Sequence, residues 1–535
     1  MTDSNSDQRH ARCAVLPTLA LGLFAFLAIW RTPYYAADFK IAPDSTEYAV
    51  GAARLVHEGI YSIRIDGVER PLRYPPWFAA FVLGPVFLFT DDLGAAQIPV
   101  ALFAALTVML VFRIGRRIGG DGGGALAALF VVAFPMFRHW GGLVMTDVPS
   151  LGLYFTTLAL FARAWRLPER RSRLYLLAGL VAALNFLVRP ITGAVFLAFG
   201  LLVLREPSWR KRIVSGVCLA LPLAVAKAAD LAYARRVFGP GGRTGYHFWS
   251  AVPYDYPDLV FNRKYISANL DDLADTRLFW YLLAALLVWA TARFARPKDE
   301  SPDRRTPEAA LPEILYAATT LVPMTTVHLF YYSGRPRYFL PALLVALLFL
   351  GAALGRLVRG RWTMVVVSLA VLGSAGFAVH RRFFALEKAP LKRIAAAEIR
   401  DLTPPDAVIL TRIPVPYVEF VANRRGTRTI TPVSRRDEYA QTVMTPTRID
   451  DPVPGPAGPK DYRCKGLLRG GAKEAVPRVA RDRLDVVEEW VRSGRPVYLE
   501  TTRFTTPADD ENWPPFLQRF SLAPVGSTLQ KLSLK

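Results

Sequence analysis

The chain has few of the residues from which metal centres and disulfide frameworks are built. Its 535 residues include 3 cysteines and 6 histidines, and none of them has metal-ligand spacing. Cys13 and Cys218 lie near the ends of apolar segments and Cys464 lies in the C-terminal region, so no disulfide is expected. A nucleotide-binding glycine motif and an internal repeat are also absent. These absences argue against zinc-type and nucleotide-dependent chemistry.

Acidic residues are fewer than basic residues. The chain carries 44 Asp and Glu against 66 Lys and Arg, a formal net charge of +22. Such a charge can indicate a nucleic-acid partner. Here, however, the basic residues form short clusters between apolar segments, as cytoplasmic loops of membrane proteins require. No nucleic-acid partner is therefore expected.

Long uncharged runs are abundant, and 52% of the residues are hydrophobic. A soluble protein of this length would split into several cores without such runs, so the sequence predicts an α-helical polytopic membrane protein. The first run, 13–30, lacks a small-residue cleavage site and is expected to be a retained helix. Further apolar runs cover 93–112, 122–137, 148–162, 174–188, 190–204, 213–226, 278–292, 314–334, 338–355 and 362–379.

Charge predicts the topology. The loops near 113–117, 163–173, 205–212, 293–305 and 356–361 hold 20 Lys and Arg residues, whereas the short connections between them hold four. This asymmetry places the first set in the cytoplasm and the C-terminal region outside. The uncharged segment 76–90 decides whether the number of spans is odd or even. If it lies on the outer surface, there are about eleven spans and the N-terminus is cytoplasmic. If it crosses the membrane, there are about twelve spans and the N-terminus lies outside. The shortness of this segment, with Asp91 and Asp92 after it, favours the surface.

Three regions follow from this pattern. Residues 1–12 form a cytoplasmic tail, and 13–380 form the transmembrane domain with a first outer loop at 31–92. Residues 381–535 are expected to form a small α/β extracytoplasmic domain, because strand-like and helix-like segments alternate there. The expected strands are 406–411, 427–432 and 496–502, the expected helices are 384–402, 415–422 and 481–494, and 443–480 is expected to be loop.

The first outer loop holds a short amphipathic helix with a carboxylate at its start. Asp44 and Glu47 have the spacing of a capping box. Tyr48, Ala52, Leu55 and Val56 then fall on one helical face, and Gly59 is a plausible stop. The pattern predicts a helix lying at a membrane surface.

Polar residues collect at the predicted outer face. Carboxylates there suit a base that removes a proton from an acceptor hydroxyl, and arginines suit a phosphate, because the guanidinium fork matches phosphate oxygens. Together they indicate a lipid-phosphate substrate. The residues are Asp38, Asp44, Glu47, Arg73, Tyr74, Arg138, His139, Asp147, Arg189, Lys227, Asp230, His328, Arg335, Arg337 and Tyr338.

Each of these residues has a structural alternative. Asp44 can be only an N-cap, Asp147 can satisfy backbone amides before Pro149, and Lys227 with Asp230 is more often a local ion pair than a site. Arg335 and Arg337 can be interfacial groups that extend to the membrane surface, and structural roles are favoured for His139 and His328. The joint placement of these residues is what favours a site.

The order of these motifs resembles the GT-C membrane glycosyltransferases, most of all the branch of protein O-mannosyltransferases and the lipid A aminoarabinose transferase. The matching features are an acidic residue opening a juxtamembrane helix (Asp44), a Pro-Pro step (RYPPW), an acidic residue after the third helix (MTDVP) and Arg-Tyr followed by Pro before a late helix (RPRYFLP). The resemblance covers about residues 13–380. Arg73 and Tyr74 stand where the aminoarabinose transferase has an acidic and a basic residue, so the donor sugar is not carried over.

The resemblance implies a hexosyl- or pentosyltransferase of the cell inner membrane that takes a monosaccharide from a polyprenyl-phosphate donor. The acceptor would be a lipid, glycan or protein at the outer face, the anomeric centre would be inverted, and the resemblance gives no reason to require a metal. Asp44 is the expected base and Asp147 a second catalytic carboxylate. The expected substrate-binding residues are Glu47, Arg73, Tyr74, His139, Arg189, Lys227, Arg335, Arg337 and Tyr338.

Two other classes remain. A transporter or lipid-sugar flippase would show paired helical repeats and broken mid-membrane helices, and neither is evident. A non-catalytic scaffold would not need Asp44 and Asp147 on one side together with the late arginines.

Overall fold

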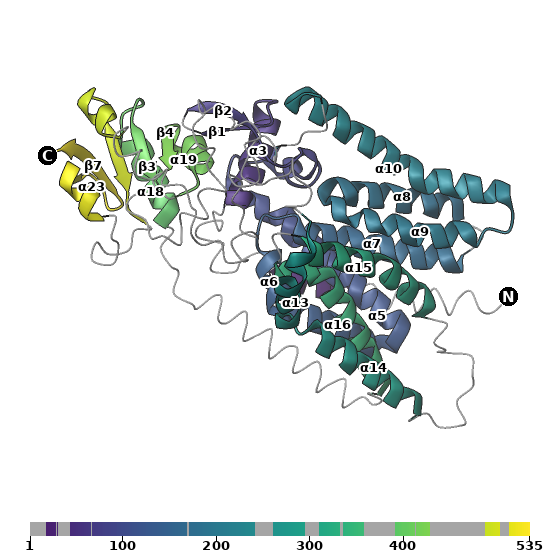
Figure 1. The fold of residues 1–535 in the computed structure, drawn as a ribbon. Coiled ribbons are helices and arrows are strands. Elements are labelled where there is room, and N and C mark those ends of the chain that lie inside the picture. The colour runs from purple at the N-terminus through teal and green to yellow at the C-terminus, as the bar shows by residue number, and fades with distance from the viewer. Residues whose placement is uncertain are drawn as a thin grey trace. The chain divides into compact units, whose positions relative to one another are not determined.

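The computed structural model describes most of the chain. The described residues are 18–27, 29, 43–65, 67–167, 171–240, 245, 261–294, 310–331, 335–357, 391–411, 413–428, 487–502 and 513–535. The expected helix at 362–379, the expected loop at 443–480, and the residues Asp38, Cys13 and Cys464 lie outside them. Contacts divide the chain into two units, which are described in turn (Figure 1). The first comprises Met1–Thr32, Gln97–Ala232 and Arg263–Ala385, and the second comprises Pro33–Ala96, Tyr233–Asn262 and Leu386–Lys535.

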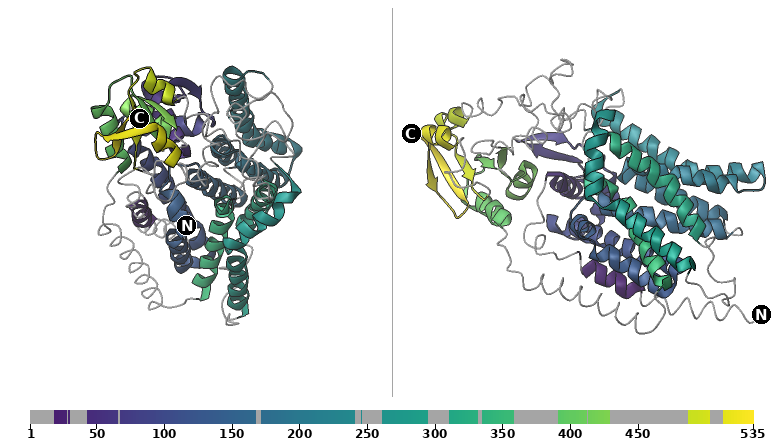
Figure 2. Two further views of the ribbon diagram at one scale, coloured as in Figure 1. Left: turned by 60° about the vertical axis from the view of Figure 1, so that its left-hand side comes forward. Right: turned by 60° about the horizontal axis from the view of Figure 1, so that its bottom comes forward.

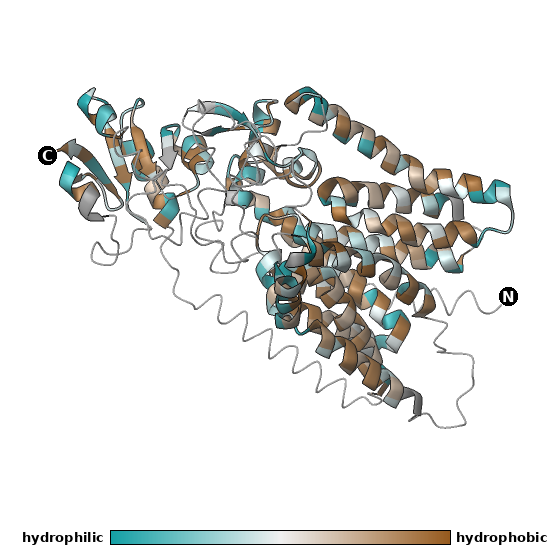
Figure 3. Ribbon diagram, viewed as in Figure 1, coloured by the Kyte–Doolittle hydropathy of each residue, from teal (hydrophilic) through white to brown (hydrophobic). Residues whose placement is uncertain are grey.

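The first unit is helical, and apolar residues predominate along its helices (Figure 3). Its helices are α5 (Gln97–Ala133), α6 (Pro135–Gly141), α7 (Asp147–Arg166), α8 (Arg171–Val188), α9 (Val195–Leu204), α10 (Trp209–Phe238), α13 (Ile266–Asp275), α14 (Leu278–Phe294), α15 (Leu311–Phe330) and α16 (Leu340–Leu357). Short turns η4 (Pro190–Ala194), η5 (Arg263–Tyr265) and η7 (Pro336–Phe339) precede α9, α13 and α16. One apolar core runs through this unit, with fully buried side chains such as Phe137, Phe155 and Phe161.

The chain is a multi-pass membrane protein. Within the described residues, three helical stretches are long and apolar enough to cross a bilayer: Leu93–Ala133, Trp209–Phe238 and Pro336–Leu357. The pair Ile266–Asp275 and Leu278–Thr291, bent by 56°, would add a fourth. Thr18–Leu27, Arg173–Val188 and Pro190–Leu204 are shorter apolar helices. The count of about eleven spans therefore stays a prediction.

Helix α5 is two helices joined at a turn. Gly120 has φ of 78°, which breaks the helix between the two apolar runs that the sequence separates. A Cβ on Gly115 would lie 3.0 Å from that of Ala127, although twelve residues of straight helix would separate them by about 18 Å. The two halves therefore fold back on each other at the arginine-rich loop predicted to be cytoplasmic.

Glycines let α16 approach α5 closely. A Cβ on Gly119 would lie 2.1 Å from the carbonyl oxygen of Ala352, and one on Gly355 would lie 2.1 Å from the nitrogen of Gly123. No side chain fits at either position without moving a backbone. Such small-residue contacts hold membrane helices together where the hydrophobic effect cannot.

Predicted cytoplasmic arginines converge on a buried carboxylate. Glu313, in the first turn of α15, has 0% exposure, and Arg166 at the end of α7 donates to both its oxygens at 2.9 and 2.7 Å. Arg117 lies 4.0 Å away. Sequence reasoning counted Arg117 and Arg166 only as topology signals, and the structure makes them partners of Glu313.

The C-terminal part of the second unit contains a mixed five-stranded sheet with the order β4-β3-β5-β7-β6. Its green and yellow strands can be seen in Figure 2. Its strands are β3 (Val408–Thr411), β4 (Arg425–Arg428), β5 (Val497–Glu500), β6 (Phe520–Pro524) and β7 (Leu529–Leu534), with helices α18 (Leu391–Leu402), α19 (Val415–Ala422) and α23 (Trp513–Arg519). β3 pairs in parallel with β4 and β5, whereas β7 pairs antiparallel with β5 and β6. The strands β6 and β7 are additions to the sequence prediction.

The first outer loop also belongs to the second unit. It contains α3 (Pro43–His57), the antiparallel hairpin of β1 (Ser62–Ile65) and β2 (Val68–Pro71), the π-helix η1 (Ala79–Leu83), α4 (Gly84–Phe87) and η2 (Leu93–Ala96). The amphipathic helix is where the sequence predicts it, and it ends before Gly59, whose φ is 70°. Residues 77–87 are helical and about 16 Å long, about half of the ~30 Å hydrocarbon core. This length favours the surface position.

Candidate active site

The first candidate cluster, in the helical unit, joins Asp147, Arg189 and Arg337, and is called here the Asp147 cluster. Asp147 begins α7, Arg189 precedes η4, and Arg337 lies within η7. Arg189 Nη1 donates to Asp147 Oδ1, and Arg337 Nη1 lies 3.8 Å from Asp147 Oδ2. The Asp147 side chain is 3% exposed. Prolines 149, 190 and 336 place these residues at helix starts, where a proline fits the first turn.

Aromatic rings cover both guanidinium groups. Arg337 lies 4.7 Å from the ring centroid of Trp140, and Arg189 lies 5.5 Å from that of Tyr338. The Tyr338 ring in turn stacks on His328 with a 4.7 Å centroid separation. Cation–π contacts of this kind orient a guanidinium without neutralising its charge.

The cluster opens onto a pocket. About 280 Å³ of empty space, including the part open to solvent, lies between α7, η4, α15 and the start of α16. Asp147, Arg189 and Arg337 line it, together with Ser150 and Tyr154. Ser150 Oγ donates to Asn185 Oδ1 at 2.7 Å. The pocket is narrow, and a small anion that entered it would meet the two guanidinium groups beside Asp147.

The second candidate cluster, in the other unit, joins Asp44, Glu47 and Arg73, and is called here the Arg73 cluster. Arg73 Nη2 donates to Asp44 Oδ1 at 3.1 Å and to Glu47 Oε1, and Arg73 Nε donates to Glu47 Oε2 at 3.2 Å. The predicted capping box is therefore corrected. Helix α3 begins at Pro43, before Asp44, and the nearby guanidinium takes the two carboxylates that the box would have used.

The two carboxylates of the Arg73 cluster differ in their access to solvent. The Glu47 side chain is 4% exposed and that of Asp44 is 29% exposed. Burial raises the pKa of Glu47, and the charge and hydrogen bonds of Arg73 oppose this shift. Asp44 is therefore the carboxylate that a substrate can reach, while Glu47 holds Arg73 in place.

Aromatic residues surround the Arg73 cluster as well. Tyr74 stacks on Tyr48 with a centroid separation of 4.4 Å, and Phe78 meets Tyr48 edge-on at 4.9 Å. Arg73 lies 5.3 Å from the Tyr74 ring. The RYPPW motif thus supplies both the cation and part of the aromatic wall.

Three predicted binding residues lie outside both clusters. Lys227 contacts Asp230 at 3.3 Å on α10, which is the local ion pair named as its alternative. His139 is exposed and meets Trp140 edge-on at 5.1 Å. Arg335 is exposed, in extended backbone just before η7.

Sequence reasoning missed Trp140 as a cover for Arg337 and gave His328 only a structural role. Trp140 stands directly after His139 in the HWGGLVMTDVP stretch, and His328 precedes the RPRY motif by a few residues. The sequence therefore pointed to both stretches, but it gave no sign that the rings of Trp140 and His328 would contact residues of other elements. Among the described residues, no group of three or more His, Cys, Asp or Glu side chains could hold a metal ion.

Known proteins match this chain in part of its sequence and in its fold. A family model described as dolichyl-phosphate-mannose-protein mannosyltransferase matches residues 73–228, and no curated protein matches. The crystal structure of ArnT from Cupriavidus metallidurans bound to undecaprenyl phosphate is 15% identical, with a TM-score of 0.58 and 97% of each chain covered. The apo structure of the same protein is 14% identical, with a TM-score of 0.54 and 98% of each chain covered. The resemblance that the motif order predicts is confirmed: the chain has the fold of these ArnT structures, and residues 73–228 match the mannosyltransferase family model.

Proposed function

We propose that the chain is a glycosyltransferase that moves a monosaccharide from a polyprenyl-phosphate donor to a lipid, glycan or protein acceptor at the outer face of the inner membrane. The observation that carries the proposal is the Asp147 cluster, in which two arginines are oriented by one carboxylate at a pocket in the helical unit. The matched ArnT structure holds undecaprenyl phosphate. That lipid supports the choice of donor class.

The proposed reaction is a single displacement. An acceptor oxygen or nitrogen bonds to the anomeric carbon, the bond from that carbon to the phosphate oxygen breaks, and the phosphate leaves with the electron pair. The acceptor proton passes to a carboxylate base. Because phosphate is already a good leaving group, the protein needs no general acid. Its tasks are to orient the sugar and to stabilise the departing charge.

Each cluster has a role in this proposal. Arg189 and Arg337 hold the lipid phosphate, since guanidinium groups bind phosphate oxygens in a fixed fork. Asp147 keeps both arginines oriented when the pocket is empty. Asp44 accepts the proton because it is the more exposed carboxylate of its cluster. Displacement in one step inverts the anomeric centre.

Replacing Arg337 with Ala tests the phosphate site. A hydrogen bond to a charged group contributes about 1.5–3 kcal/mol, so polyprenyl phosphate should bind purified Arg337→Ala protein about 10- to 150-fold more weakly. Arg337→Lys should lose less, because Lys keeps the charge but not the fork. Arg335→Ala is the matched control, since Arg335 is exposed and outside the cluster. Unchanged affinity in both alanine variants would place the phosphate elsewhere, for example at Arg73 or Lys227.

Reporter fusions test the proposed topology. A reporter after Lys535 should be active only outside the cytoplasm, and one at residue 300 only inside, because the charged loops on that side are predicted to be cytoplasmic. A reporter near residue 65 should also be active outside. Cytoplasmic activity at residue 65 would take Asp44 away from an outer-face reaction and contradict the mechanism.

A further inference from the structure

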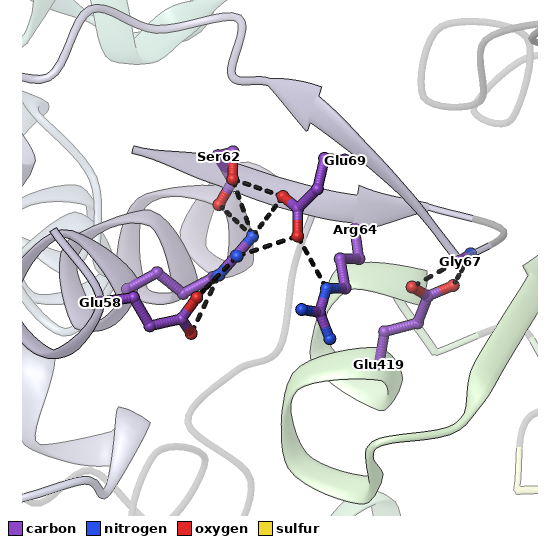
Figure 4. Close-up of polar contacts among 7 residues, drawn as sticks. Glu58, Ser62, Arg64, Gly67, Glu69 and Glu419 are labelled. Carbon is purple, nitrogen blue, oxygen red and sulfur yellow. Dashed lines mark hydrogen bonds and ion pairs between the residues drawn. The ribbon is translucent and has the colours of Figure 1, made fainter. Parts of the chain in front are cut away.

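The β1–β2 hairpin of the first outer loop is tied to α3 by the buried Arg54, whose partners Glu58, Ser62 and Glu69 are labelled in Figure 4. The Arg54 side chain is 4% exposed, and its Nη1 and Nη2 donate to Glu69 Oε2 and Glu58 Oε2, each at 2.7 Å. Arg54 Nη1 also donates to Ser62 Oγ at 2.8 Å. The hydrogen bonds from Arg54 lower the pKa of Glu69 to about 2, so this carboxylate stays charged at neutral pH. The hairpin is therefore fixed to the helix that carries Asp44 and Glu47.

The tip of the same hairpin is tied to the C-terminal sheet by one carboxylate. Glu419 on α19 is 5% exposed and accepts the N–H of Gly67 at 3.0 and 3.3 Å. It also accepts the N–H of Gly426 on β4 at 2.9 Å. Figure 4 shows Glu419 pointing at the turn that contains Gly67. A buried carboxylate is costly unless it is hydrogen-bonded, so Glu419 ties the two backbones together.

The hairpin leads directly into the Arg73 cluster. Strand β2 ends at Pro71, Leu72 is fully buried, and Arg73 follows. A two-stranded hairpin alone is marginally stable in water, so the position of this one depends on the groups that hold it. They include Arg54 on one side and Glu419 at the tip. A shift at Gly67 would pass along six residues to Arg73.

We propose that the C-terminal α/β domain positions the Asp44–Glu47–Arg73 cluster by holding the tip of the β1–β2 hairpin, with Glu419 as the positioning residue. This gives the domain a role in the transfer reaction without any contact to substrate. The activity part of the inference rests on the proposed function, whereas the positional part does not.

The test uses the full-length protein with Glu419→Ala and the milder Glu419→Gln, whose single carbonyl oxygen keeps one acceptor. The matched control is Glu398→Ala. Glu398 accepts bonds from Ser527 and Thr528 within the C-terminal domain. Partial burial raises the pKa of Glu398, but these bonds lower it overall. The control therefore also removes a well-bonded carboxylate of the domain.

Amide hydrogen exchange measures directly how firmly the backbone of the hairpin is held. Glu419→Ala should speed exchange at Gly67 and at the amides of residues 69, 70, 72 and 73 about 5- to 150-fold, because the N–H of Gly67 and the buried N–H of Gly426 lose a charged acceptor. The kcat for transfer should fall by a similar factor while donor affinity stays unchanged. Glu419→Gln should be intermediate in both, and Glu398→Ala should leave exchange at 69–73 and kcat near the parent values.

Each other outcome contradicts part of the inference. Unchanged exchange at Gly67 in folded Glu419→Ala protein would show that Glu419 does not hold the tip. Faster exchange at Gly67 without change at Arg73 would show that the hairpin does not transmit the loosening of its tip to Arg73. Altered exchange at both Gly67 and Arg73 with a parental kcat would show that the position of the Arg73 cluster does not affect transfer. If Glu419→Ala does not fold, the same criteria apply to Glu419→Met, which fills a similar volume and offers no oxygen to the N–H groups of Gly67 and Gly426. If Asp44→Asn keeps full activity while Glu419→Ala still alters exchange at Arg73, the base assignment fails and the positional link stands.

Discussion

Asp44→Asn protein is expected to fold normally and to transfer sugar about 10²–10⁴-fold more slowly than the parent, the usual contribution of a general base. Asn keeps a carbonyl oxygen that can accept the 3.1 Å bond from Arg73, and Glu47 remains as the charged partner of that arginine. The substitution therefore removes proton acceptance and one charge while the fold of the cluster is kept. The measurement is the transfer rate of purified protein, normalised to folded protein, with a polyprenyl-phosphate sugar.

Glu47→Gln is the matched control for Asp44. Glu47 is nearly fully buried and accepts two bonds from Arg73, so its loss should lower stability more than the rate of the folded fraction. Asp147→Asn should also impair transfer, because Asp147 orients Arg189 and Arg337. A parental transfer rate in Asp44→Asn would leave Asp44 a structural role, and the base would have to be sought at Asp147 or Asp38.

Arg166→Ala is expected to cost about 3–5 kcal/mol of stability, as is usual when one partner of a buried ion pair is removed. Glu313 has no exposed surface and receives two hydrogen bonds from Arg166, so the variant leaves a buried carboxylate without its main partner. Denaturation midpoints of the purified protein in detergent measure the effect. Adding Glu313→Gln to Arg166→Ala should restore much of the loss, because the uncompensated charge is then gone.

Arg117→Ala serves as the control for Arg166. Arg117 is 4.0 Å from Glu313 and 47% exposed, so its removal should cost less than about 1 kcal/mol, as for surface ion pairs. Equal midpoints for Arg166→Ala and the parent would show that Glu313 is accommodated without its arginine.

The helix starts were largely predictable because their signals are local. Gly59 and the Pro-Pro step mark the end of one short element and the start of another through backbone geometry. Helices α3 and α19 lie where the apolar patterns of 44–56 and 415–422 predict them, although the cap expected at Asp44 does not form. The common predicted face also named Asp147, Arg189 and Arg337 before their contact was known. The local sequence pattern identified the candidate residues, and the predicted topology limited them to those at the outer face.

The pairings could not be predicted, because they join residues far apart in the chain. Local spacing assigned Glu47 to a capping box, and only the folded structure brings Arg73 to it from beyond the hairpin. Glu313 and Glu419 gave no sequence signal, since a carboxylate in an apolar run looks the same whether or not a partner reaches it. The strands β6 and β7 were missed because β6, at the sheet edge, ends in a proline, and β7 carries polar residues on its exposed face.

The glycine contact between α5 and α16 imposes an order on biosynthesis. The ribosome makes α5 long before it makes α16. Until α16 is made, the backbone at Gly119 and Gly123 lacks its packing partners Ala352 and Gly355. Lipid cannot replace that fit, because association of this kind depends on direct backbone packing. The bundle therefore closes only after α16 has been inserted. A translation product halted before residue 340 would lack the helix that closes this contact.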